Sequence, residues 1–205
     1  TLILYSVATR RGQTSVATML LAGIALGALA GAISGILVYK ANDQQLRDLT
    51  FWGLGSLAGA SWAKVIVAGP LIGIAILFAA RLGHGLNALA LGEATAAHIG
   101  VATQNLKNKA IFTVAAATGI AVAVSGGIGF IGIVVPHLVR QLIGPDHRTL
   151  IVNSGLLGAI ILVLADVISR IIVAPAELPI GIITAVIGAP VFLWILLSNR
   201  REGNW

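Results

Sequence analysis

Long apolar runs without charge constrain this chain more than any other feature. Residues 16–39 contain no Asp, Glu, Lys or Arg in 24 positions. A bilayer core about 30 Å thick is spanned by roughly 20 apolar helical residues, at a rise of 1.5 Å per residue. Five further apolar runs lie at 62–80, 110–125, 128–143, 150–173 and 178–197. The third and fourth of the six are short. The pattern predicts an all-α, polytopic bundle of transmembrane helices with six full or partial spans.

Composition excludes several functional classes. Only 10% of the 205 residues are charged and 58% are hydrophobic, whereas a soluble domain has about 25% charged residues. An ordinary soluble enzyme, a disordered chain and a nucleic-acid-binding module are therefore excluded. The sequence has no cysteine, and it contains no P-loop, H-E-x-x-H or G-x-S-x-G motif. We expect no catalytic constellation, no cofactor, no metal site and no nucleic-acid partner.

The basic residues fall into two groups that predict the orientation. Under the positive-inside rule, the more basic set of loops faces the cytoplasm. Nine basic residues fall on one predicted side of the membrane and four on the other. The nine are Arg10, Arg11, Arg81, Lys107, Lys109, Arg140, Arg148, Arg200 and Arg201. The four are Lys40, Arg47, Lys64 and Arg170. The C-terminus and the connection 81–109 are therefore predicted to be cytoplasmic. The apolar run 1–8, followed by Arg10, is interpreted as the end of an earlier span of a longer polypeptide.

Four glycines form a stripe on the first complete span. Gly23, Gly27, Gly31 and Gly35 recur every four residues, which places them on one slowly drifting helix face. Such a face lets another backbone approach closely, or lines a passage. Both interpretations stay open, and they are compatible at a dimer axis.

The predicted span 150–173 contains two charged residues, Asp166 and Arg170. Their i,i+4 spacing puts them on one helix face within pairing distance. Either they form an internal ion pair that makes a polar helix end tolerable, or Arg170 presents its charge to a partner protein. Charges inside spans are rare and usually functional.

The cytoplasmic connection contains a short polar segment, 89–101 (LALGEATAAHIGV). Glu93 lies near the start of a predicted short helix, and Gly100 is suited to the position that follows its end. Such a helix is either a surface connector or a docking element. A further motif, 127–132, matches G-x-G-x-x-G but lacks the βαβ context of a dinucleotide site. We interpret it as a break between two half-length helices.

Several longer motifs, in the same order, resemble one family. They are 20–28 (LLAGIALGA), 51–62 (FWGLGSLAGASW), 87–101 (NALALGEATAAHIGV), 127–148 (GIGFIGIVVPHLVRQLIGPDHR), 164–170 (LADVISR) and 174–190 (APAELPIGIITAVIGAP). Together they resemble permease subunits of bacterial ABC importers for iron-siderophores, haem and cobalamin, which are type II importers of the iron-chelate permease family. The resemblance covers essentially the whole chain.

The resemblance implies an assembly. Such permeases have about ten spans and work as homodimers in the inner membrane, with two ATPase subunits and a periplasmic substrate-binding protein. Residues 1–205 then correspond to one permease domain, from the end of span four to span ten, with an N-terminal portion missing. Residues 82–109 correspond to its cytoplasmic loop with the coupling helix. The implied function is ATP-driven import by alternating access, in contact with membrane lipid and without chemistry of its own.

The resemblance also assigns roles to residues. The implied ATPase-coupling residues are Gly92, Glu93, Ala94, Ala96, Ala97 and Gly100. Arg170 corresponds to an arginine that docks the binding protein. The glycine stripe and the 178–197 span correspond to helices that line the pathway, and Thr14, Ser15 and Thr18 fall where a cytoplasmic gate is expected.

Two alternatives stay open from the residues alone. An ion-coupled secondary transporter would run on a proton or sodium gradient without an ATPase. A non-transporting membrane interaction subunit would need no pathway. The ligand stays open among siderophore, haem and cobalamin.

Overall fold

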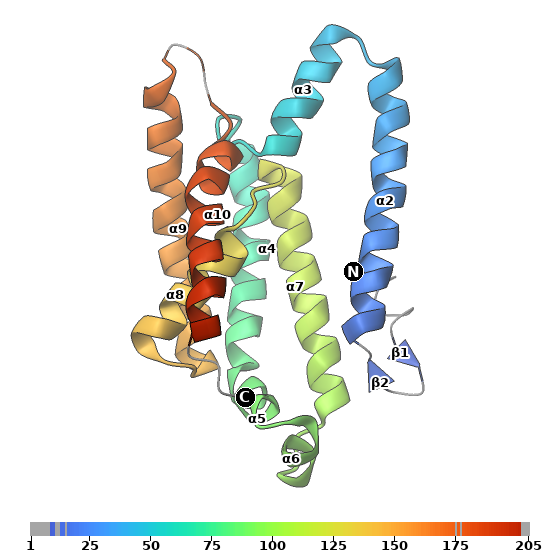
Figure 1. Cartoon of the computed structure of the whole chain (residues 1–205), viewed down its shortest axis with the longest axis vertical. Coiled ribbons are helices and arrows are strands. Elements are labelled where there is room, and N and C mark those ends of the chain that lie inside the picture. The colour runs from blue at the N-terminus through green and yellow to red at the C-terminus, as the bar shows by residue number, and fades with distance from the viewer. Residues whose placement is uncertain (1–8, 11–12, 15, 175, 177, 202–205) are drawn as a thin grey trace.

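The computed structural model describes residues 9–10, 13–14, 16–174, 176 and 178–201. Within them the chain forms a bundle of helices (Figure 1), which confirms the predicted all-α, polytopic class. Two-residue strands β1 (Thr9–Arg10) and β2 (Gln13–Thr14) pair antiparallel, with Thr9 opposite Thr14. The helices are α2 (Val16–Lys40), α3 (Asp43–Leu54), α4 (Trp62–Arg81), α5 (Gly83–Ala90), α6 (Glu93–His98), α7 (Thr103–Ser125), α8 (Ile131–Ile143), α9 (His147–Ile172) and α10 (Ile180–Arg201).

All six predicted apolar runs contain a helix. Four helices, α2, α4, α7 and α9, are long and apolar enough to cross a membrane, and α8 and the Ile180–Ile195 part of α10 are shorter apolar helices. One boundary differs from the prediction. The run at 110–125 was expected to be short, but α7 begins at Thr103 because the polar residues before the apolar run continue the helix. Only α8, with 13 residues, is half-length beside the predicted glycine break.

The molecule has two distinct ends (Figure 1). The α6 end carries α5, α6, the start of α7 and the junction between α8 and α9. The α3 end carries α3, the end of α9 and the start of α10. Arg81, Lys107 and Arg148 belong to the first end, whereas Lys40 and Arg170 belong to the second. These five basic residues thus lie at the ends that the sequence assigns to their two groups.

Helix α3 is an element that the spacing of apolar residues did not predict. It starts with a capping box, in which the Gln45 amide donates to Asn42 Oδ1 at 2.8 Å and the Asn42 amide donates to Gln45 Oε1 at 3.1 Å. This pair satisfies two amide groups that a helix start leaves without partners. The Asn-x-x-Gln spacing is readable in the sequence, so the signal for this helix was present.

Three helix ends meet in a helix-end junction, formed by residues 52–56, 125–130 and 180–181. The Ser56 amide donates to Ser125 O at 2.8 Å, and the Gly127 amide donates to Trp52 O at 3.4 Å. A Cβ at Gly126, whose φ is +72°, would collide with Trp52 O, and one at Gly181 would collide with Leu54 O. Backbone therefore packs directly on backbone here, which glycine alone permits.

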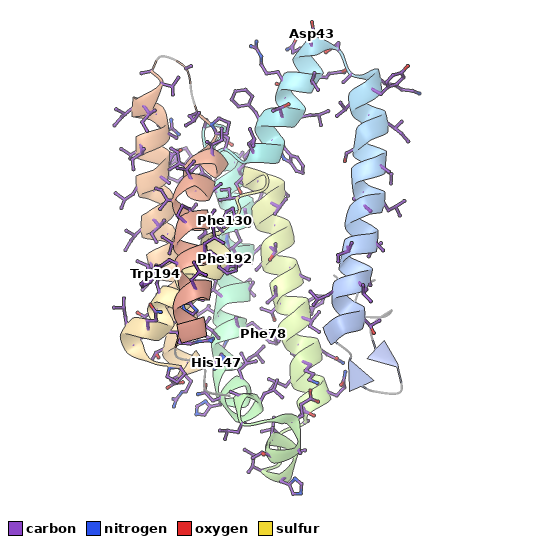
Figure 2. The ribbon with its side chains drawn as sticks, viewed as in Figure 1. Asp43, Phe78, Phe130, His147, Phe192 and Trp194 are labelled. Atoms are coloured by element: carbon purple, nitrogen blue, oxygen red, sulfur yellow. The ribbon has the colours of Figure 1, made fainter. Side chains whose placement is uncertain are left out.

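Phe130 closes the junction toward α8. It has a left-handed φ of +66°, and its carbonyl accepts the amides of Ile133 and Val134 to start α8. Its side chain lies against Gly188 of α10, where an added Cβ would come within 2.5 Å of Phe130 Cβ. Figure 2 places Phe130 beside α10, away from both ends of the molecule. The break at 127–132 is thus a packed helix start without a βαβ unit.

Apolar packing holds the second half of the chain together. Val135 and Val139 of α8 pack with Leu150 of α9, and Ala165 of α9 packs with Ile180 and Ile183 of α10. These clusters make α8, α9 and α10 one packed group, which α4 and α5 also contact.

We predict that Gly126→Ala destabilises the protein by about 2–4 kcal/mol, since the methyl group meets a carbonyl and the backbone is left-handed. Gly155→Ala in α9 is the matched control, because no described atom lies within 4 Å of its added Cβ. The control should change stability by about 1 kcal/mol or less, in the favourable direction. Thermal unfolding in detergent measures both, and equal effects would contradict the packing assigned to the junction.

Candidate coupling and docking sites

Helices α5 and α6 project beyond the bundle between the ends of α4 and α7 (Figure 1). Two glycines bring α5 close to its neighbours. A Cβ at Gly85 would lie 2.9 Å from Leu106 of α7, and one at Gly83 would lie 3.0 Å from Arg148 Cα of α9. The segment is therefore packed against two long helices at its base while its tip extends away.

The end of α6 has a defined capping geometry. The Gly100 amide donates to Ala97 O at 3.0 Å, the Val101 amide donates to Ala96 O at 3.0 Å, and Gly100 has φ +85°. This pair of hydrogen bonds is a Schellman motif with Gly100 at C′. The sequence prediction that Gly100 follows the helix end is confirmed.

The residues expected to couple to an ATPase divide into two kinds. Ala96 is fully buried, where α6 packs on α5 and α7. Gly92, Glu93, Ala94, Ala97 and Gly100 are exposed. Two apolar side chains flank the helix, Leu91 with 69% and Ile99 with 61% of their surface exposed. The tip thus presents an apolar and small-residue surface on a fixed helix.

Glu93 has a partner within the chain. Lys107 Nζ of α7 donates to Glu93 Oε1 at 2.5 Å, and the side chains are 18% and 64% exposed respectively. An ion pair with this exposure contributes at most about 1 kcal/mol. The ion pair instead fixes the position of α6, because it connects the start of this helix to the first turns of α7.

Arg170 lies at the other end of the molecule and is paired as the spacing predicts. Its Nε donates to Asp166 Oδ2 at 2.9 Å and its Nη2 to Asp166 Oδ1 at 3.4 Å. The Arg170 side chain is 46% exposed. The internal ion pair is therefore present, and the guanidinium also reaches the surface of the α3 end.

The glycine stripe lies on a helix that stands beside the bundle (Figure 1). No described atom lies within 4 Å of a Cβ added at Gly27, Gly31 or Gly35, and Gly23 is half-buried. Among the residues expected at a gate, Thr18 is exposed in α2 and Thr14 belongs to β2, while Ser15 lies outside the described residues.

Sequence reasoning missed a polar cluster at the base of α5. Asn87 Nδ2 donates to Asp146 Oδ1 at 2.7 Å, and the His147 amide donates to Asn87 Oδ1 at 2.8 Å. These partners are 59 and 60 positions apart. Asp146 before the long run of α9 is readable as a helix cap, but its contact with Asn87 depends on tertiary packing.

Apolar helices of spanning length, a glycine-packed junction and a projecting short helix define a multi-pass membrane protein. The family model of the FecCD transport family matches residues 1–198. This chain belongs to the FecCD transport family, which confirms the predicted resemblance.

The relatives are transport permeases. The chain is 45% identical over 194 residues to the hemin transport system permease protein HmuU of Yersinia pestis, covering 95% of this chain and 58% of the relative. It is 41% identical over 201 residues to the vitamin B12 import system permease protein BtuC of Citrobacter koseri, covering 98% and 60%. The solved structure of a metal-chelate type ABC transporter in an inward-facing conformation superposes with a TM-score of 0.84 at 33% identity, covering 90% of this chain and 60% of that one. The chain thus spans about 60% of the length of these proteins.

We predict that Gly100→Ala loosens the end of α6, because alanine in a left-handed conformation costs about 1–2 kcal/mol. No described atom crowds the site, so the effect is purely conformational. Gly100→Asn should be milder, since asparagine tolerates this conformation. Hydrogen exchange of the Gly100 and Val101 amides measures the effect. Unchanged protection in Gly100→Ala would contradict the Schellman assignment.

Proposed function

We propose that the complete protein is the permease subunit of an ATP-driven importer of the bacterial inner membrane. It moves an iron chelate, haem or cobalamin from periplasm to cytoplasm by alternating access, and a separate subunit hydrolyses ATP. The observation that carries this proposal is the projecting α6 helix with its exposed apolar flanks, in a chain of the FecCD transport family. The names of the hemin and vitamin B12 relatives support the substrate classes.

The ATPase is proposed to dock on α6. Exposed apolar side chains outside a bilayer are typical of binding surfaces, and Leu91 and Ile99 flank the helix on both sides. Gly92, Glu93, Ala94, Ala97 and Gly100 supply the remaining surface, and Ala96 holds the helix on the bundle. An ATPase can bias the permease only through contacts that differ between its open and closed states. A helix tied at its base by Glu93 and Lys107 would pass such a difference to α7.

A periplasmic substrate-binding protein is proposed to dock at the α3 end through Arg170. The C-terminus and the loop 82–109 then face the cytoplasm, as the larger basic group predicts. A carboxylate of the partner would share the guanidinium with Asp166, because Arg presents several donors in a fixed plane.

The pathway is proposed to form at the axis of a homodimer. The open glycine face of α2, with Gly23, Gly27, Gly31 and Gly35, would line it together with α10, and Thr14, Ser15 and Thr18 would contribute to its cytoplasmic gate. Residues 1–205 would form part of one permease domain, with α2 and the other spans in contact with lipid.

We predict that Ile99→Asp abolishes co-purification of the complete permease with its ATPase, because a charge replaces an apolar contact at the tip. Tyr39→Asp is the matched control, since Tyr39 is 89% exposed at the α3 end. The control should keep the ATPase. Retention of the ATPase by both variants would contradict docking on α6, and no association even in the unmodified protein would favour an ion-coupled carrier.

We predict that Arg170→Glu weakens association with the binding protein by roughly tenfold in low salt, with a smaller effect in high salt. Arg170→Lys should retain most of the affinity. Lys64→Glu makes the same charge change at the same end and serves as the control. Titration of the binding protein against the permease in nanodiscs measures the affinities. An equal loss in Lys64→Glu would assign the effect to overall charge instead of Arg170.

A further inference from the structure

Helix α5 is joined to three long helices in different ways. It follows α4 directly through Leu82, and it leads through α6 to the start of α7. Helices α5 and α9 are not consecutive in sequence, and they meet through tertiary packing, where Gly83 packs on the Arg148 backbone. Any displacement of α6 therefore reaches α4 and α7 through covalent connections, and it reaches α9 only through packing and side chains.

The Asn87 side chain of α5 makes polar contacts with the start of α9 through both the nitrogen and the oxygen of its amide group. Its Nδ2 donates to Asp146 Oδ1 at 2.7 Å, while its Oδ1 accepts the backbone amide of His147 at 2.8 Å and lies 2.9 Å from His147 Nδ1. The partners fix the orientation of the amide, because an ionised carboxylate only accepts and a backbone N–H only donates. Figure 2 shows His147 at the end of the molecule where α5 lies.

Asp146 Oδ1 accepts a second hydrogen bond, from the first turn of α9. Its Oδ1 also accepts the Arg148 amide at 2.9 Å, so this carboxylate caps the start of α9. The hydrogen bond from Asn87, followed by that from the Arg148 amide, holds the pKa of Asp146 below its usual range. A lowered pKa means that the contact is present at neutral pH and is lost only in acid below that pKa. The Asp146 carboxylate is therefore charged at neutral pH.

Helix α9 connects this contact with the opposite end of the molecule. It has 26 residues and is about 39 Å long, and it carries Asp166 and Arg170 in its last turns. It also packs on α8 and α10 through the apolar clusters described above. A movement imposed on the start of α9 would therefore be shared by α8 and α10.

We propose that Asn87 and Asp146 form the joint that passes displacement of the α5–α6 segment to α9, and through α9 to the α8–α10 group. The inference rests on the proposed function, because the displacement would come from the ATPase. Asn87 acts here as a positioning residue, since it works through the start of α9 and touches no transported ligand. The Glu93–Lys107 pair would hold the same segment on α7, so the two contacts together attach it to both α7 and α9.

An exchange of the two side chains tests the joint. Asn87→Asp places two carboxylates against each other, which should separate α5 from α9. Adding Asp146→Asn restores a donor and an acceptor, because the amide at position 146 can cap Arg148 and donate to the carboxylate at position 87. Asn105→Asp, an exposed site on α7, adds the same charge at the same end without touching the joint. Asn87→Ala removes the contact without repulsion.

The readout is substrate uptake per ATP hydrolysed by the complete transporter in proteoliposomes. Asn87→Asp and Asn87→Ala should lower this ratio by roughly fivefold or more, with the ATPase still bound. The double variant should recover most of the ratio, and Asn105→Asp should keep it. A purely structural role would lower assembly and thermal stability but leave the ratio of the assembled complex unchanged.

Three results would contradict the proposed role of Asn87 and Asp146. An unchanged ratio in both single variants, an equal loss in Asn105→Asp, or no recovery in a correctly assembled double variant would each contradict it. Uptake by the unmodified transporter distinguishes these failures from failure of the proposed function. If the unmodified complex shows no ATP-driven uptake, then the proposed function fails and the role of the joint fails with it.

Discussion

The bilayer offers no water to backbone groups, so every break in a helix at membrane depth must be satisfied by other protein atoms. The helix-end junction meets this requirement where α3 ends, α7 gives way to α8 and α10 begins. Gly126 and Gly181 allow carbonyl groups of Trp52 and Leu54 to approach the neighbouring backbone directly. The half-length α8 helix, and hence the packing of α8, α9 and α10, depends on this close approach.

The sequence predicted the features that depend on local chemistry. Within the described residues the apolar runs located every spanning helix, the sequence predicted Gly100 at the end of α6, and the spacing of Asp166 and Arg170 predicted their pairing. The start of α7 was misplaced, because polar residues 103–109 continue a helix that hydropathy alone ends early. Helix α3 was missed although its capping box was readable.

Contacts between distant residues were beyond sequence reasoning. Glu93 with Lys107, and Asn87 with Asp146, are 14 and 59 positions apart. Neither pair has a spacing that a helix or strand period would single out, because tertiary packing brings them together. These two pairs attach the α5–α6 segment to α7 and to α9. The residues that fix the projecting helix in place are thus the ones that local patterns do not reveal.

Cross-linking tests the central claim, that α6 is the surface on which the ATPase docks, most directly. Residues 1–205 contain no cysteine. A cysteine is placed at Ala97, which is exposed on α6, in an otherwise cysteine-free transporter and compared with one at Tyr39 at the α3 end. The account predicts that Ala97→Cys forms a cross-link to the ATPase of the assembled transporter and that Tyr39→Cys forms none. An assembled transporter in which Ala97→Cys gives no cross-link would contradict the claim.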